Sequence, residues 1–239
     1  GEHGSRIPQF GGSEQAPGVP GGFARGMAPV YRAPMFSARP CPAPGCTGTV
    51  VSGFDTCARH LADPAGPRAA LEALAAAGAG LRDLDMRGVR LAGLRLDGAA
   101  ISGGDFAGAV FEDVSLRGAA VSLSFFDGAA FSRCDFGGST VQSSVFAGAL
   151  LTGCSFEDCE VVQCSFVGAR AASVRFDHSN LYDSRFVAAV LEGVSMRDCN
   201  LTRARFEPSH LAQVDMRASN TNQAVFAQAR DGRPAGVRQ

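Results

Sequence analysis

Hydrophobic residues recur at every fifth position over more than half of the chain. Counting in fives from Leu81 to Phe226 gives 30 positions, and 28 of them carry Leu, Ile, Val, Met or Phe. The exceptions are Ala171 and Thr221. The residue two places before each of these centres is nearly always small, and the other three places are mostly polar or glycine. Since this period fits neither a helix nor an isolated strand, it predicts a repeat architecture.

A second period, of twenty residues, indicates the shape of the repeat. Phenylalanine occupies every twentieth position from Phe106 to Phe226, and alanine does so from Ala109 to Ala189. Four units of five therefore make one turn, and residues twenty apart stack at the ~4.8 Å spacing of β-strands. The pattern predicts an all-β solenoid, a four-sided parallel β-helix of about seven coils that is roughly 35 Å long.

This repeat resembles that of the pentapeptide repeat family, whose unit is a small residue, a polar residue, a central Leu or Phe, and two further positions. The segments NLTRA, NLYDS and DFAGA, which begin at Asn200, Asn180 and Asp105, match the unit. The resemblance covers residues 81–228. It implies a right-handed coil with a square cross-section.

Five of the eight cysteines lie inside the repeat, at separations that are multiples of five. Cys154, Cys159 and Cys164 stand beside Glu157, Asp158 and Glu160, a composition typical of metal or redox sites. All three thiols, however, occupy the small inward position, whereas the three carboxylates occupy outward positions. Because the two sets project to opposite sides of the backbone, we expect these cysteines to act as small buried residues.

The other three cysteines lie before the repeat, in the segment CPAPGCTGTVVSGFDTCARHL. Cys41, Cys46, Cys57 and His60 follow the spacing C-x4-C-x10-C-x2-H, with a Pro/Gly turn between the first two and a short helix carrying the last two. Such a Cys₃His set fills a tetrahedral Zn²⁺ site and predicts a structural metal. The alternatives are a Cys41–Cys46 disulfide with Cys57 free, and a Cys57 nucleophile with His60 as its base.

The remaining segments complete the domain organisation. Residues 1–40 are rich in Pro and Gly, which predicts a disordered tail, and residues 41–62 hold the metal motif. Residues 63–80 predict a helix, beginning near Pro67, that caps the first coil. The β-helix spans 81–228 and a C-terminal tail spans 229–239. This tail is at best a weak cap, so an end-to-end homodimer is an alternative.

Composition and charge limit the compartments and the classes of partner that we expect for this protein. A formal net charge of −1 argues against direct binding of nucleic acid or anionic membranes. No apolar run reaches the ~18 residues of a membrane span, and no signal peptide is evident, so we expect a cytoplasmic protein.

Apolar residues at outward positions are the most unusual surface feature. Phe125, Val145, Val167 and Val187 share one side of the predicted coil, and Leu150 and Val190 lie just around its corner. A contiguous patch of this kind is typical of a protein interface, for an unknown partner or for self-association. The alternative is an ordinary surface of β-favouring residues.

Two functions are consistent with these features. The first is a non-enzymatic interaction scaffold, because no inward polar cluster and no insertion interrupts the repeat. The second is implied by the resemblance, since some pentapeptide repeat proteins mimic duplex DNA, bind DNA gyrase or topoisomerase IV, and give quinolone resistance or self-immunity. A mimic needs a densely acidic surface. Residues 80–228 hold 17 acidic residues and 13 arginines, a net charge of only −4, which favours the scaffold.

Overall fold

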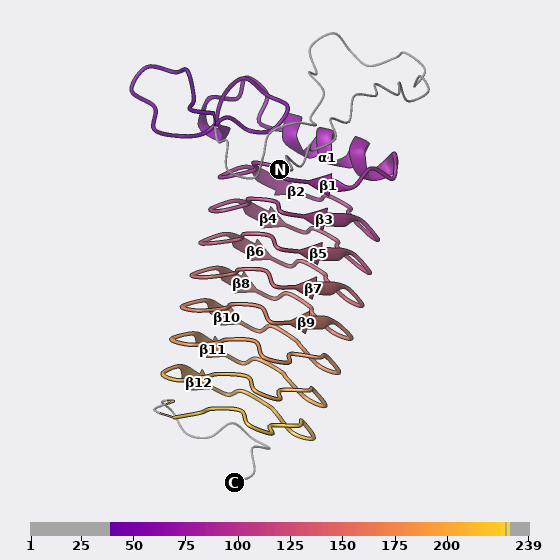
Figure 1. The fold of residues 1–239 in the computed structure, drawn as a ribbon, viewed down its shortest axis with the longest axis vertical. Helices are drawn as coiled ribbons and strands as arrows, with labels where there is room; N and C mark the ends of the chain where they lie inside the picture. Colours follow the sequence, from indigo (N-terminus) through magenta and orange to yellow (C-terminus); the bar gives the residue numbers. More distant parts are fainter. Residues whose placement is uncertain (1–38, 228, 230–239) are drawn as a thin grey trace, which may run out of the picture.

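The computed structural model describes residues 39–227 and 229. The tails predicted at the two ends fall mostly on residues 1–38 and 230–239, outside the described residues. A 3₁₀-helix η1 (Ala58–His60) and an α-helix α1 (Gly66–Ala76) precede the strands (Figure 1). The strands are β1 (Leu81–Arg82), β2 (Arg90–Ala92), β3 (Ala100–Ser102), β4 (Val110–Glu112), β5 (Ala120–Ser122), β6 (Ala130–Ser132), β7 (Thr140–Gln142), β8 (Leu150–Thr152), β9 (Glu160–Val162), β10 (Arg170–Ala172), β11 (Val190–Glu192) and β12 (His210–Ala212).

The strands form a parallel β-helix with a register of twenty residues, which confirms the predicted fold class. One sheet runs in the order β1-β3-β5-β7-β9, and the other in the order β12-β11-β10-β8-β6-β4-β2. Leu91 pairs with Phe111 and Val121 with Val141, both twenty residues apart. Two further columns of parallel bridges, such as Asp85 to Asp105 and Arg95 to Ser115, form the other two sides of each coil. Every coil is therefore four-sided, as the period of twenty predicts.

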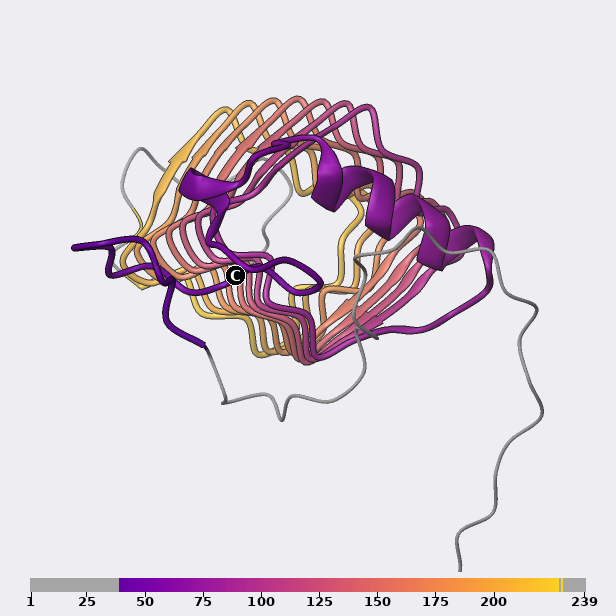
Figure 2. The same cartoon turned by 90° about the horizontal axis from the view of Figure 1, so that it is seen from above.

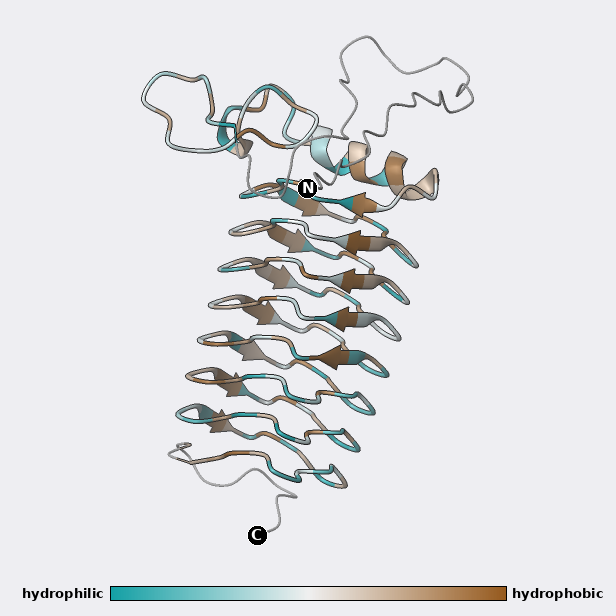
Figure 3. Cartoon of the chain, in the orientation of Figure 1, coloured by the Kyte–Doolittle hydropathy of each residue, from teal (hydrophilic) through white to brown (hydrophobic). Residues whose placement is uncertain are grey.

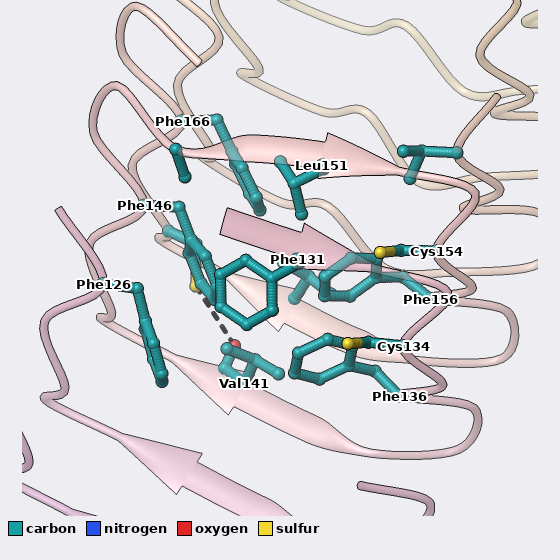
Figure 4. Close-up of a cluster of buried hydrophobic side chains, with 14 of the residues drawn as sticks. Phe126, Phe131, Cys134, Phe136, Val141, Phe146, Leu151, Cys154, Phe156 and Phe166 are labelled. Atoms are coloured by element: carbon teal, nitrogen blue, oxygen red, sulfur yellow. Dashed lines mark hydrogen bonds between the residues drawn. The ribbon is translucent and has the colours of Figure 1, made fainter. Parts of the chain in front are cut away.

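The interior is filled by the central and small residues of each unit, and Figure 3 shows the hydrophobic colour on the strands. Phenylalanine rings stack directly on their counterparts in the next coil. The ring centroids of Phe126 and Phe146 lie 4.7 Å apart and those of Phe146 and Phe166 lie 4.9 Å apart (Figure 4). The ring planes in these two pairs are tilted by 12° and 10°. Stacking at the strand spacing thus lets one side chain fill the same place in every coil.

The corners of the coil are left-handed turns. The residue two places after each centre has a positive φ at most corners, for example Gly148 at 64° and Asp158 at 57°. Glycine is favoured there because it has no Cβ, and Asp tolerates the conformation better than most residues. Leu123 adopts the same conformation, with φ 51°, and leaves its side chain 56% exposed.

The cysteines of the repeat point inward, while Asp158 and Glu160 are exposed. The Cys159 thiol donates to the Phe136 carbonyl at 3.0 Å, and Ser179, one coil later, donates to the Phe156 carbonyl at 2.6 Å. Cysteine and serine therefore perform the same packing and hydrogen-bonding role at this position. Burial raises the pKa of Cys164 to about 12 and that of Cys199 to about 11. These two thiols are protonated at neutral pH, unlike metal ligands or nucleophiles.

The first coil is covered by α1 and by the segment 41–62, which we call the head. Helix α1 lies across the end of the coil, with Leu71 fully buried against it (Figure 2). It begins one residue before Pro67 and ends two residues before Gly78, close to the predicted limits. The head closes the unpaired strand edge, because Asp85 receives a hydrogen bond from the Ser52 N–H at 2.8 Å and donates one to the Ser52 hydroxyl at 2.8 Å. In later coils the preceding coil supplies such partners, as Leu84 does for the N–H of Asp105.

The stacked rings predict a large and position-specific effect on stability. Phe146→Ala should lower the free energy of unfolding by ~3–5 kcal/mol, because it removes a fully buried ring between two others. Phe125→Ala, on the same side one coil earlier, should cost less than ~1 kcal/mol because Phe125 is 39% exposed. Urea denaturation followed by circular dichroism measures both, and equal losses would contradict the stacking argument.

Candidate metal centre

A tight turn presents the first two ligands. The Cys46 N–H donates to the Ala43 carbonyl at 3.1 Å, and Gly45 supplies the left-handed residue of the turn with φ 70°. Beyond the turn, the Cys41 N–H donates to the Gly48 carbonyl at 2.8 Å and draws the two arms together. One antiparallel bridge, between Pro40 and Thr49, follows the turn.

The 3₁₀-helix η1 presents the other two ligands. Cys57 is its N-cap, and the His60 N–H donates to the Cys57 carbonyl at 2.9 Å. This single turn places residues three apart on the same face, so the Cys57 sulfur lies 3.3 Å from His60 Nδ1. The spacing C-x2-H therefore brings both side chains to one point.

The four side chains converge in the geometry that a tetrahedral metal requires. The ligand atoms of Cys41, Cys46, Cys57 and His60 all lie within 4.8 Å of one another. The Cys46 and Cys57 sulfurs are 3.6 Å apart, and the Cys41 sulfur is 3.5 Å from His60 Nδ1. Zn–S bonds of ~2.3 Å in a tetrahedron give edges of ~3.8 Å, with slightly shorter edges to nitrogen. The residues thus fit Zn²⁺ by donor type, by number and by separation.

Neighbouring groups favour thiolates at this point. Backbone hydrogen bonding from Cys57, and then from Ala43, lowers the pKa of Cys41. The Gly48 N–H donates to the Cys46 sulfur at 3.3 Å, and Arg59 Nη2 lies 3.6 Å from the same sulfur. A Zn²⁺ with three thiolates and a neutral imidazole carries one net negative charge, which the Arg59 guanidinium offsets. The surroundings therefore suit an anionic metal complex.

The structure also bears on the two alternatives for this segment. All eight cysteines are free, and the Cys46 sulfur contacts Cys57 rather than Cys41, the partner that a Cys41–Cys46 disulfide would require. Among the contacts of the described residues, the His60 ring meets two thiols and no carboxylate that would orient it as a base. Neither arrangement matches a disulfide or a nucleophile with its base.

The outward apolar residues occupy the places that the period assigns to them, and we call them the apolar stripe: Phe125, Val145, Leu150, Val167, Val187 and Val190. Phe125 and Val145 are bridged neighbours in successive coils, and Phe125 is 39% exposed. Leu150 is 47% exposed, and the valines are half-buried. Arg170 pairs with both Leu150 and Val190 and separates them. On the side that carries Phe125, Val145 is followed in its column by Ser165.

A family model for the pentapeptide repeat region matches residues 139–216, within the coils described above. Residues 139–216 therefore match the pentapeptide repeat that the period of five predicts. No curated protein matches the chain by sequence.

Solved structures with the pentapeptide repeat fold are similar to this chain at low sequence identity. HetL of the cyanobacterium Nostoc, involved in heterocyst differentiation regulation, is 16% identical, with 66% of this chain and 91% of HetL covered and a TM-score of 0.31. QnrB1, a plasmid-mediated fluoroquinolone resistance protein, is 18% identical, with 63% and 83% covered and a TM-score of 0.32. A protein of the Arabidopsis thaliana thylakoid lumen is 23% identical, with 51% and 64% covered and a TM-score of 0.20.

The pentapeptide repeat pattern did not identify three residues that matter to the head and the surface. Ser52 holds the head on the first coil, Arg59 faces the thiols, and Leu123 is the most exposed of the large hydrophobic residues described. Arg59 had a detectable signal, because it lies between two ligands in the motif CARH. Leu123 occupies a corner position at which glycine is common, and a leucine at that position could have indicated an exposed side chain.

Zinc content tests the metal assignment directly. The chain purified without chelators should hold about one Zn²⁺, and Cys57→Ala should lose most of it, because a three-ligand site binds the ion far more weakly. Cys159→Ser is the matched control, since it alters a buried thiol of the repeat and should keep the full zinc content. Elemental analysis measures all three proteins. Absence of zinc in the wild-type chain, or full zinc in Cys57→Ala, would overturn the assignment.

Proposed function

We propose that this protein is a non-enzymatic interaction scaffold, in which the pentapeptide repeat coil forms a rigid rod and a structural Zn²⁺ stabilises the head. The observation that carries the proposal is the unbroken register of twenty from Leu81 to Val225. Each coil is bonded to the next on all four sides, so the outward residues are held at fixed positions along a straight surface. On such a scaffold, the outward-facing residues of each column determine which partner binds.

The interior offers little to an enzyme. Among the described residues, those buried inside the coil are apolar apart from serine hydroxyls and thiols, most of which bond to backbone carbonyls. The buried carboxylate of Asp177 stands at an outward position, 2.7 Å from Arg197. A pocket of about 290 Å³ lies between the head and the first coil. Its two arginines are already engaged, Arg59 with Cys46 and Arg87 with Asp85. These features support a binding role over catalysis.

The surface charges support a scaffold over a DNA mimic. Arginines pair with carboxylates along and between coils, as Arg133 does with Asp113 at 2.7 Å and Arg117 with Asp135 at 2.7 Å. A topoisomerase-binding DNA mimic requires rows of unpaired negative charge comparable to those of a duplex. The cytoplasmic location stays a prediction. None of the described helices is long and apolar enough to cross a membrane.

The apolar stripe is the contact surface in this proposal. Phe125 and Val145 stand next to each other in one column, and Val167 and Val187 continue the apolar surface one position beyond each centre on the same side. The side chains at these positions point away from the coil, so a bound partner would bury them. The head contacts this side at Asp85, in the first coil.

A double variant tests the contact surface. Phe125→Arg with Val145→Asp should leave the far-ultraviolet circular dichroism spectrum and the zinc content unchanged, because both residues are outward. The same variant should weaken association by about tenfold or more, since it places two charges in an apolar contact. Sedimentation velocity measures self-association, and binding to any partner captured by the wild-type chain is compared in parallel. Unchanged association in both would remove the apolar stripe from the proposal.

A further inference from the structure

The side of the coil that carries the apolar stripe has a graded charge along its length. We call it the phenylalanine side, defined by the centres at 86, 106 and every twentieth position to 226. The residues just before these centres form one column, linked by parallel bridges throughout: Asp85, Asp105, Phe125, Val145, Ser165, Arg185, Arg205 and Val225. From Asp85 to Arg205 the column is acidic at its N-terminal end, apolar at Phe125 and Val145, and basic at its C-terminal end, and Val225 lies one coil beyond Arg205.

This gradient is antisymmetric about Val145. Asp105 lies two coils before Val145 and Arg185 two coils after it, while Asp85 and Arg205 lie three coils before and after it. Turning the column end over end about Val145 therefore places each carboxylate opposite a guanidinium. A two-fold axis that lies in an interface between two such sides, perpendicular to the rods, performs this operation.

The neighbouring column obeys the same operation. The residues just after the centres are Arg87, Ala107, Asp127, Ala147, Val167, Val187, Glu207 and Ala227. About Ala147, Arg87 falls opposite Glu207. The ion pair of Arg87 with Asp85 then faces the ion pair of Arg205 with Glu207, each charge against its opposite. The middle of the contact is Val145 and Ala147 with their copies, and Asp127 is the one charged residue that falls opposite an apolar residue, Val167.

The acidic end is not neutralised within the chain. Arg87 contacts both Asp85 and Asp105, so one guanidinium serves two carboxylates. Asp127 adds a third carboxylate, and the pKa of Asp127 is raised by burial and by the negative charge of Asp105. At the basic end, Arg205 pairs with Glu207, whereas Arg185 is exposed and has no ion-pair partner among the described residues. Each end therefore carries surplus charge that the other end can balance.

We propose that the partner of the apolar stripe is a second copy of this chain, docked antiparallel along the phenylalanine side with Val145 at the two-fold axis. The inference rests on the proposed function, because it names the occupant of the same contact surface. Each dimer contains two contacts of Asp105 with Arg185 and two of Asp85 with Arg205, on either side of the apolar centre. Six coil steps span roughly 29 Å at ~4.8 Å each, a narrow interface that corresponds to reversible association.

A parallel arrangement of two copies is distinguishable from the antiparallel one. A two-fold axis along the rods would bring the column before the centres against the column after them. Asp105 would then face Ala107, and Arg185 would face Val187. Only in the antiparallel dimer does Asp105 of one copy contact Arg185 of the other.

Charge reversal provides the test. Asp105→Arg alone should place two arginines opposite each other in both halves of the dimer, and Arg185→Asp alone should place two aspartates opposite each other. Each should raise the dimer dissociation constant by about tenfold or more, because each change acts twice. An equimolar mixture of the two variants should recover a heterodimer near wild-type affinity, since every contact again joins opposite charges. Sedimentation velocity over a concentration series measures all of these.

The controls lie on the other sides of the coil. Arg95→Asp and Glu192→Arg are exposed charge reversals away from the phenylalanine side and should leave the dissociation constant unchanged. Circular dichroism checks that every variant is folded. A wild-type chain that stays monomeric at about 200 μM, or variants whose mixture forms no heterodimer, would overturn the antiparallel dimer. If the variant with Phe125→Arg and Val145→Asp loses association while the charge mixture fails, the apolar stripe stands and the second copy is excluded as its antiparallel occupant.

Discussion

The stacking of each inward side chain on its counterpart twenty residues away is the constraint on which this structure depends. A coil of four five-residue sides buries its centres only if the next coil presents a residue of similar size at the same place. Phe126, Phe146 and Phe166 meet this condition with ring separations near the strand spacing. The same register bonds the backbone of every coil to the next, so packing and hydrogen bonding reinforce one another. The outer columns inherit this order, which is why charges and apolar residues form lines on the surface.

The register also separates two uses of one residue type. Cys159 and Cys164 are inward residues that donate to backbone carbonyls, and serine replaces them one coil later. Cys41, Cys46 and Cys57 lie outside the register and converge with His60 on one point. The head is too small to be stabilised by its own core, since few of its residues are buried. In the proposed function, a Zn²⁺ held by these four residues would stabilise the fold of the segment that covers the first coil.

The coil could be predicted from the sequence because a period of five repeated over residues 81–226 leaves little freedom in the backbone. The position of Cys159 and the convergence of Cys57 with His60 followed from spacing alone. Ser52 could not be placed in the same way, because its bond to Asp85 joins two segments whose relative position depends on the fold of the head. The exposure of Leu123 required its actual surroundings at the corner. The interruption of the apolar stripe by Arg170, in contrast, follows from the period of twenty, which places Arg170 between Leu150 and Val190.

Counting reactive thiols tests the division of the cysteines most directly. The eight cysteines are free, and five of them are buried in the coil. A folded chain treated with a strong zinc chelator and then with a thiol reagent should expose three reactive thiols, Cys41, Cys46 and Cys57. The remaining five should react only when denaturant unfolds the coil, in step with the loss of the circular dichroism signal. Reaction of more than three thiols in the folded, chelated chain would contradict the account.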